Sequence, residues 1–119
     1  MAQETILLVE DEPAVRQLFA MALTRAGYRV HEARNGEEAL KLFEEIGDSV
    51  DLLLTDMRMP YMGGAELAKR LRERKEGLKL LCISGYPGSL ENEVATDFLA
   101  KPFSRDEMLK KVRDVLDRA

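Results

Sequence analysis

The chain has 119 residues, of which 34% are charged, and its formal net charge at neutral pH is −4. This length predicts one domain, residues 1–119, that can bury a core without disulfides or metals. The acidic balance without a basic stripe argues against direct nucleic-acid binding. No apolar run approaches the roughly 18 residues that span a bilayer, and acids stand where a signal peptide would be positive. With a single cysteine, these features predict a cytoplasmic protein.

Apolar runs suited to buried strands alternate along the chain with segments of helical period. The expected strands are Ile6 to Val9, Tyr28 to His31, Val50 to Leu54, Leu78 to Ile83 and Phe98 to Ala100. Such alternation, repeated five times, favours a parallel sheet covered on both faces, because each crossover helix needs an apolar surface to cover. The predicted fold class is α/β, doubly wound.

The first expected helix has Pro13 in its first turn and Gly27 at its C-terminal stop. Its predicted buried face consists of Val15, Leu18, Phe19, Ala22 and Ala26. This face should pack on the sheet.

The second expected helix starts at the N-cap Asn35, with Glu38 three residues on, and runs to Gly47. The third ends near Gly77, and the last opens with a capping box from Ser104 to Glu107. The connection "SGYPGSLENEVATD" is rich in Gly, Pro and Ser, so the helix between the fourth and fifth strands should be short or absent.

Polar side chains follow four of the expected strands. Glu10 and Asp11 close the first, Asp56 the third, Ser84 the fourth and Lys101 the fifth. Sites in open α/β sheets form beyond the carboxyl ends of the strands. Because the first and third strands would be neighbours, the three acids should converge.

Three close carboxylates repel one another by on the order of 4 kcal/mol per pair at ~4 Å and an effective dielectric near 20. The hard cation Mg²⁺ binds such oxygens and leaves room for a phosphate oxygen. The pattern therefore predicts a phosphoryl site. In it, Asp56 is the nucleophile, Mg²⁺ and Lys101 neutralise the phosphoryl oxygens, and Ser84 hydrogen-bonds one of them.

Four motifs, in this order and spacing, carry a resemblance: "ILLVEDE", "LLLTDMRMPYMGG", "LLCISGY" and "FLAKPF". Together they resemble the receiver domain of bacterial two-component response regulators over essentially the whole chain. The "GYPG" connection followed by "FLAKPFS" is similar to receivers fused to hybrid histidine kinases.

The resemblance implies a flavodoxin-like (βα)5 three-layer fold with strand order 2-1-3-4-5 and a cis peptide between Lys101 and Pro102. It implies that Asp56 is the phosphoacceptor and that Glu10 and Asp11 are the metal-binding pair. The backbone carbonyl of Arg58 would complete the coordination.

By the same resemblance, Ser84 is the switch hydroxyl and Lys101 the invariant lysine. The implied function is a phosphorylation-controlled switch that takes its phosphoryl group from a histidine kinase or a histidine phosphotransfer domain. The exposed face near Pro13, Ala14 and Gln17, together with the loop of the fifth strand, would dock that partner. The resemblance implies a signalling domain rather than an enzyme, with self-catalysed transfer and slow autodephosphorylation at most.

The chain departs from the family pattern in two places. Phe98 stands where many relatives have a tyrosine, so it has no hydroxyl to bond outward, and the fourth helix is truncated. Both departures argue against signalling through the face that many relatives use, which is formed by the fourth helix, the fifth strand and the fifth helix.

Two other functions compete with the switch. A Mg²⁺-dependent phosphohydrolase of the haloacid-dehalogenase type needs a second aspartate two residues after the nucleophile, and Arg58 occupies that position. A pseudo-receiver, a protein-binding module without the chemistry, is disfavoured because every expected site residue is present. His31 is expected to be a structural or surface histidine, and Cys82 a core residue. Met57, Met59 and Met62 are expected to pack over the edge of the site and not to be metal ligands.

Overall fold

The computed structural model describes residues 3–59, 61–84 and 97–118. Five parallel strands form one sheet in the order β2-β1-β3-β4-β5, which confirms the predicted fold class and strand order. The strands are β1 (Thr5–Val9), β2 (Arg29–Ala33), β3 (Leu52–Asp56), β4 (Lys79–Ser84) and β5 (Asp97–Ala100). Each expected strand is present, and no strand end differs from the expected one by more than two residues.

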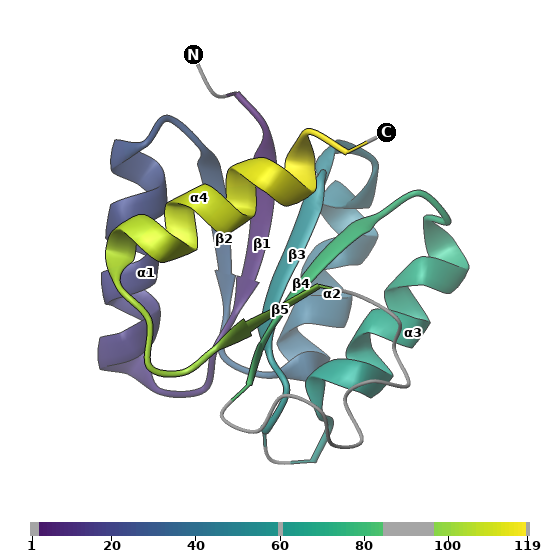
Figure 1. Cartoon of the computed structure of the whole chain (residues 1–119). Coiled ribbons are helices and arrows are strands. Elements are labelled where there is room, and N and C mark those ends of the chain that lie inside the picture. Colours follow the sequence, from purple (N-terminus) through teal and green to yellow (C-terminus); the bar gives the residue numbers. More distant parts are fainter. Residues whose placement is uncertain (1–2, 60, 85–96, 119) are drawn as a thin grey trace.

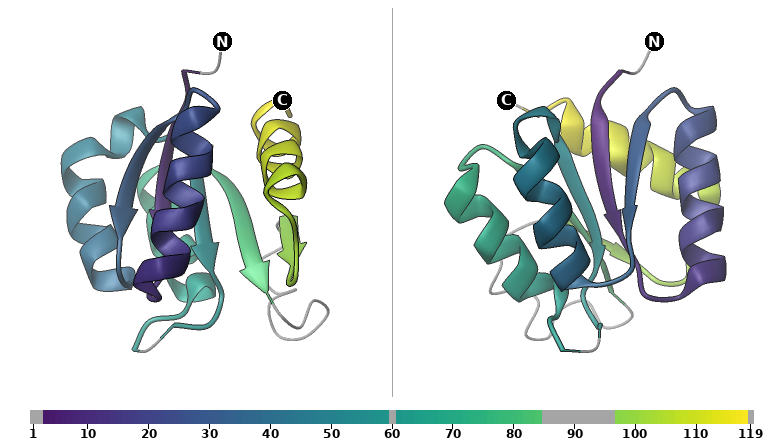
Figure 2. Two further views of the ribbon diagram at one scale, coloured as in Figure 1. Left: turned by 90° about the vertical axis from the view of Figure 1, so that its left-hand side faces the viewer. Right: turned by 180° about the vertical axis from the view of Figure 1, so that it is seen from behind.

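Helices cover both faces of the sheet (Figures 1 and 2). On one face lie α1 (Pro13–Arg25) and α4 (Arg105–Leu116); on the other lie α2 (Gly36–Ile46), the 3₁₀ turn η1 (Gly47–Ser49) and α3 (Gly64–Arg74). Among the described residues, no helix combines the length and apolar character that crossing a membrane requires.

The alternation of side chains along each strand produces two cores. In β1, Ile6 and Leu8 join the core under α1 and α4, whereas Leu7 and Val9 join the core under α2 and α3. All four are fully buried. Strands buried on both faces appear in the sequence as continuous apolar runs, which is why they could be recognised there.

Local signals set several helix ends as predicted. The side chain of Asn35 accepts the Glu38 N–H at 2.8 Å at the start of α2. Ser104 and Glu107 form the predicted capping box of α4. Gly27, with φ of 102°, follows the end of α1, and only glycine adopts this conformation without cost.

The predicted buried face of α1 is partly wrong. Leu18 is 64% exposed, and Ala26 is exposed after the helix end. Ala22 is buried and Phe19 packs against the core, as predicted, but the helix also buries Ala20 and Leu23. Periodicity locates an apolar stripe, but the contacts of α1 with β2 and α4 set its rotation on the sheet.

The second helix ends where predicted, since Gly47 caps α2 and continues into η1. The third helix ends at Arg74, three residues before Gly77. The predicted short or absent helix between the fourth and fifth strands falls in residues 85–96, outside the described residues.

Three further sequence expectations can be compared with the fold. Cys82 is fully buried in β4, which confirms it as a core residue. His31 lies half-buried on β2. Of the methionines after Asp56, Met57 is buried in the core under α2 and α3, and Met59 and Met62 pack against it.

Candidate functional site

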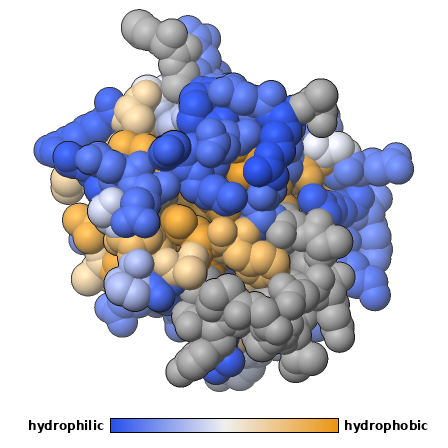
Figure 3. All heavy atoms as spheres, viewed as in Figure 1, coloured by the Kyte–Doolittle hydropathy of each residue, from blue (hydrophilic) through white to orange (hydrophobic). Residues whose placement is uncertain are grey.

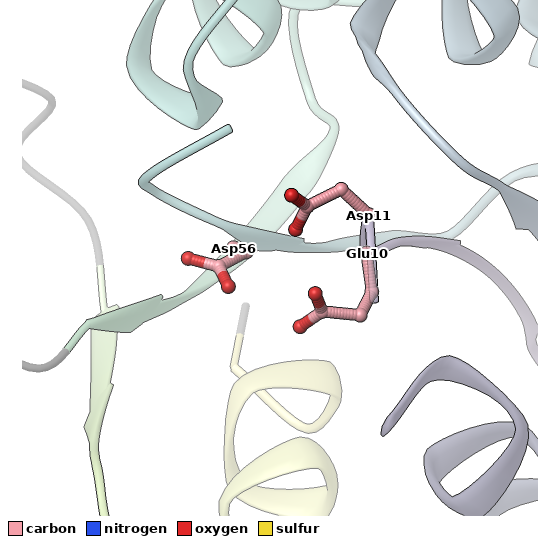
Figure 4. A group of neighbouring side chains, drawn as sticks. All are labelled: Glu10, Asp11 and Asp56. Atoms are coloured by element: carbon pink, nitrogen blue, oxygen red, sulfur yellow. The ribbon is translucent and has the colours of Figure 1, made fainter. Parts of the chain in front are cut away.

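Three carboxylates meet at the carboxyl edge of the sheet (Figure 4). Glu10 and Asp11 follow the end of β1, and Asp56 is the last residue of β3. One carboxylate oxygen from each lies within 4.8 Å of the others. The predicted convergence of these acids is therefore confirmed.

Strand pairing brings the acids together. β1 and β3 are parallel neighbours in which Val9 pairs with Thr55, so the residues that follow them reach the same edge. The Glu10 N–H donates to the Ala33 carbonyl at 3.1 Å, which extends the contact between β1 and β2 to this position. The placement thus follows directly from register.

Glu10 is the most constrained of the three acids. Its side chain is 2% exposed, and its Oε2 accepts the Glu12 N–H at 3.0 Å. Within the described part of the chain, its buried Oε1 has no hydrogen-bond partner. Burial, reinforced by the Asp11 and Asp56 carboxyls, raises the pKa of Glu10 to about 7. The site therefore holds a buried acid with an open coordination position.

Asp56 is 6% exposed, and each of its oxygens has a donor nearby. The Arg58 N–H donates to Oδ1 at 3.0 Å, and Nζ of Lys101 lies 3.2 Å from Oδ2. Lys101 therefore reaches the acids from the end of β5, as predicted. The peptide between Lys101 and Pro102 is cis, which confirms the implied isomer.

Ser84 ends β4 at the same edge of the sheet. In the strand register it pairs with Ala100, and its neighbour Ile83 pairs with Asp56. The role of the Ser84 side chain stays a prediction. Phe98 pairs with Cys82 and packs against the core under α2 and α3.

The sequence analysis did not identify Gly64 as a site residue. A Cβ on Gly64 would lie 2.5 Å from the Asp56 carbonyl oxygen, and the Gly64 N–H donates to Met57 O at 3.1 Å. The start of α3 thus packs directly on the backbone that carries Asp56. The glycine pair in "YMGG" was the available signal, since paired glycines often mark close backbone approach.

The sequence analysis also missed Arg16, which is 13% exposed and contacts the backbone of Glu10. An arginine in an amphipathic helix ordinarily signals a solvated surface. No pattern along the chain distinguishes Arg16 from exposed arginines.

The donor set fits a hard divalent cation. With every group ionised, three carboxylates and the Lys101 ammonium sum to a charge of −2. The unpartnered Oε1 of Glu10 offers a ligand oxygen that no protein group uses within the described residues. Mg²⁺ prefers such oxygens and commonly binds through one or two carboxylates.

The sequence matches that of known proteins along most of its length. The family model for the response regulator receiver domain matches residues 6–113. Sensor kinase CckA of Brucella abortus is 40% identical over 119 residues, a match that covers 96% of this chain but 13% of CckA. Transcriptional regulatory protein TrcR of Mycobacterium tuberculosis is 33% identical, covering 96% of this chain and 46% of TrcR. The chain thus spans less than half the length of these curated relatives.

Solved structures agree with the sequence match. The receiver domain of hybrid histidine kinase CckA has a TM-score of 0.84 and 38% identity, covering 95% of this chain and 99% of that one. Response regulator TrrA of Thermotoga maritima, solved in complex with Mg²⁺-BeF, has a TM-score of 0.82 and 35% identity, with 94% and 98% covered. With its sheet order and the acids at its carboxyl edge, the chain belongs to the response regulator receiver domain family.

Proposed function

We propose that this chain is the phosphorylation-controlled switch of a two-component phosphorelay, with Asp56 as its phosphoacceptor. A carboxylate oxygen of Asp56 would attack the phosphorus of a phosphohistidine, forming an acyl phosphate as the phosphorus–nitrogen bond breaks. The observation that supports this most is the placement of Asp56. It is 6% exposed, lies beside Glu10 and Asp11, and has Nζ of Lys101 3.2 Å from its Oδ2.

Glu10, Asp11, Asp56 and the backbone carbonyl of Arg58 would hold Mg²⁺. The bound cation would supply positive charge to the oxygens of the transferred group. The open Oε1 of Glu10 supports this assignment, as does the Mg²⁺-BeF complex of the related TrrA. The protein's own part is to keep three acids close enough to share one ion.

Two further residues would act on the phosphoryl group. Lys101, which already contacts Asp56, would neutralise one phosphoryl oxygen. The Ser84 hydroxyl would hydrogen-bond another, and its movement together with Phe98 would convert phosphorylation into a change of shape.

The proposed partner is a histidine kinase or a histidine phosphotransfer domain. Pro13, Ala14 and Gln17 are exposed at the start of α1, close in sequence to the acids. Leu18 and Met21 are 64% and 51% exposed on the same helix and line a groove against α4. Figure 3 shows hydrophobic residues at the surface below α4. An exposed apolar surface suits a docking protein.

The similarity to CckA supports a receiver from a hybrid kinase. We propose one receiver domain over residues 1–119 that acts in the cytoplasm, without direct contact to nucleic acid. As a phosphoacceptor it would transfer a phosphoryl group to itself and lose it slowly, but it would not turn over a small phosphoester. Arg58, which occupies the position of the second catalytic aspartate in a phosphohydrolase, supports this distinction.

The test is phosphorylation by acetyl phosphate with Mg²⁺, read by intact mass. We expect a phosphoryl adduct on the wild type and on Asp48→Asn, a control at an exposed aspartate in η1. Asp56→Asn should carry none. Equal labelling of Asp56→Asn and the wild type would reject Asp56 as the acceptor, and steady release of phosphate over many turnovers would favour the phosphohydrolase.

A further inference from the structure

Arg16 lies on the first turns of α1, and its environment differs from that of a surface arginine. Its side chain is 13% exposed. Nη1 donates to the backbone carbonyl of Glu10 at 2.8 Å, and Nε lies 3.4 Å from the Glu32 carboxylate on β2. One guanidinium thus connects α1, the end of β1 and the edge strand of the sheet.

These contacts fix the backbone of Glu10 from two sides. Its N–H is held by the Ala33 carbonyl at 3.1 Å, and its own carbonyl is held by Arg16. The Glu10 side chain that departs from this backbone has one buried oxygen, Oε1, with no hydrogen-bond partner among the described residues. The position of that oxygen therefore depends on the Arg16 contact.

Arginine suits this role better than lysine. Its planar guanidinium presents donors in fixed directions, so one nitrogen can bind the Glu10 carbonyl while another faces Glu32. A lysine would keep the charge but offer one ammonium on a flexible stem. Replacing Arg16 by Lys therefore tests the geometry of its contacts separately from its positive charge.

We propose that Arg16 is a positioning residue that fixes Glu10 for binding of a divalent cation, and so sets the Mg²⁺ affinity of the site. This inference depends on the proposed function, because it concerns a residue that supports one of the proposed ligands of the same cation. Partners that orient metal ligands typically change metal affinity by about 10- to 100-fold when they are lost. Arg16 acts on Glu10 without itself touching the cation or the phosphoryl group.

The test measures the Mg²⁺ dissociation constant by calorimetry on the unphosphorylated chain, for the wild type, Arg16→Gln and Arg16→Lys. We expect both variants to bind Mg²⁺ about tenfold more weakly, because both lose the two-directional contact. Glu32→Gln, which leaves the Arg16 contact with Glu10 in place, should show a smaller rise in the Mg²⁺ dissociation constant. Arg25→Gln, an exposed arginine on the same helix, is the control for loss of charge.

A second readout separates positioning from a damaged fold. Labelling by acetyl phosphate should be slow for Arg16→Gln at low Mg²⁺ and should approach the wild-type rate at saturating Mg²⁺. Urea unfolding identifies the variants that remain folded. If the Arg16 variants do not fold, Glu32→Gln is the deciding variant. It removes the charge that orients the Arg16 guanidinium against Glu10, so an unchanged Mg²⁺ affinity there would overturn the inference.

When the Arg16 variants fold, three results would overturn the role of Arg16. They are Mg²⁺ binding within twofold of the wild type in the folded variants, an equal loss in Arg25→Gln, and a labelling defect that saturating Mg²⁺ does not restore. Failure of the wild type itself to bind Mg²⁺ or to be labelled would instead reject the proposed function, so the two failures are distinguishable.

Discussion

Charged side chains have different kinds of partner at the two edges of the sheet. At the amino edge, Glu4 pairs with Arg113, with Oε2 and Nη2 2.5 Å apart, and Nζ of Lys79 donates to the Leu116 carbonyl at 2.6 Å at the end of α4. The Thr5 N–H donates to the Asp51 carboxylate at 2.8 Å. At the carboxyl edge, three acids share one nearby lysine, and a buried oxygen of Glu10 has no partner among the described residues.

This difference separates stability from function. Charges at the amino edge meet protein groups of opposite sign, so they tie β1 and α4 into the fold. Charges at the carboxyl edge repel one another, which lowers stability until something positive binds. Natural proteins depart from locally consistent design chiefly at functional sites. The contrast between the edges can be tested by substitutions whose effects should differ in size or in sign.

The largest expected effect is at Gly64. Gly64→Ala places a Cβ 2.5 Å from the Asp56 carbonyl oxygen, so backbone must move, and we expect the free energy of unfolding to fall by about 2–3 kcal/mol. Labelling of Asp56 should fall as well. Gly77→Ala is the matched control at the amino edge, because a Cβ there has no atom within 4 Å. Urea unfolding compares them, and similar losses in both would remove the close approach as the cause.

Glu10→Gln should change stability in the opposite direction. In EDTA at pH 8, we expect the free energy of unfolding to rise by about 1–2 kcal/mol, because a buried, crowded carboxylate is replaced by a neutral amide. Wild-type stability should increase with added Mg²⁺, and the variant should gain less. Thermal unfolding with and without Mg²⁺ measures both. A less stable Glu10→Gln would mean that the carboxyl edge is not repulsive.

The smallest expected effect is at Glu4. The hydrogen bond from Arg113 is the main cause that holds the pKa of Glu4 at about 2, below its ordinary value of 4.5. A lowered carboxyl pKa stabilises the fold above pH 4.5, and this contribution is lost as pH falls toward 2. The pair is partly exposed, so Glu4→Gln should cost about 0.5 kcal/mol at pH 7.

Unfolding of Glu4→Gln and the wild type between pH 7 and pH 2.5 measures that loss. The difference between the two proteins should shrink below pH 4.5. A difference that stays constant across this range would show that the carboxylate charge of Glu4 does not contribute.

The sequence by itself determined the alternation of strands and helices, because strands buried on both faces and helix caps such as Asn35 and Ser104 are local signals. It also determined which edge carries the acids, since parallel strands bring their carboxyl ends to one side. Residues at strand ends could therefore be assigned to a site before any distance was known.

Only the tertiary structure decided the features that depend on contacts between distant segments. It exposed Leu18 and turned Arg16 toward the backbone of Glu10 by setting the rotation of α1. It brought Gly64 against the backbone of Asp56 and left one oxygen of Glu10 open. The physical reason is that side-chain period gives the presence of an apolar face, whereas its rotation and the neighbours of each polar atom follow from packing against other elements.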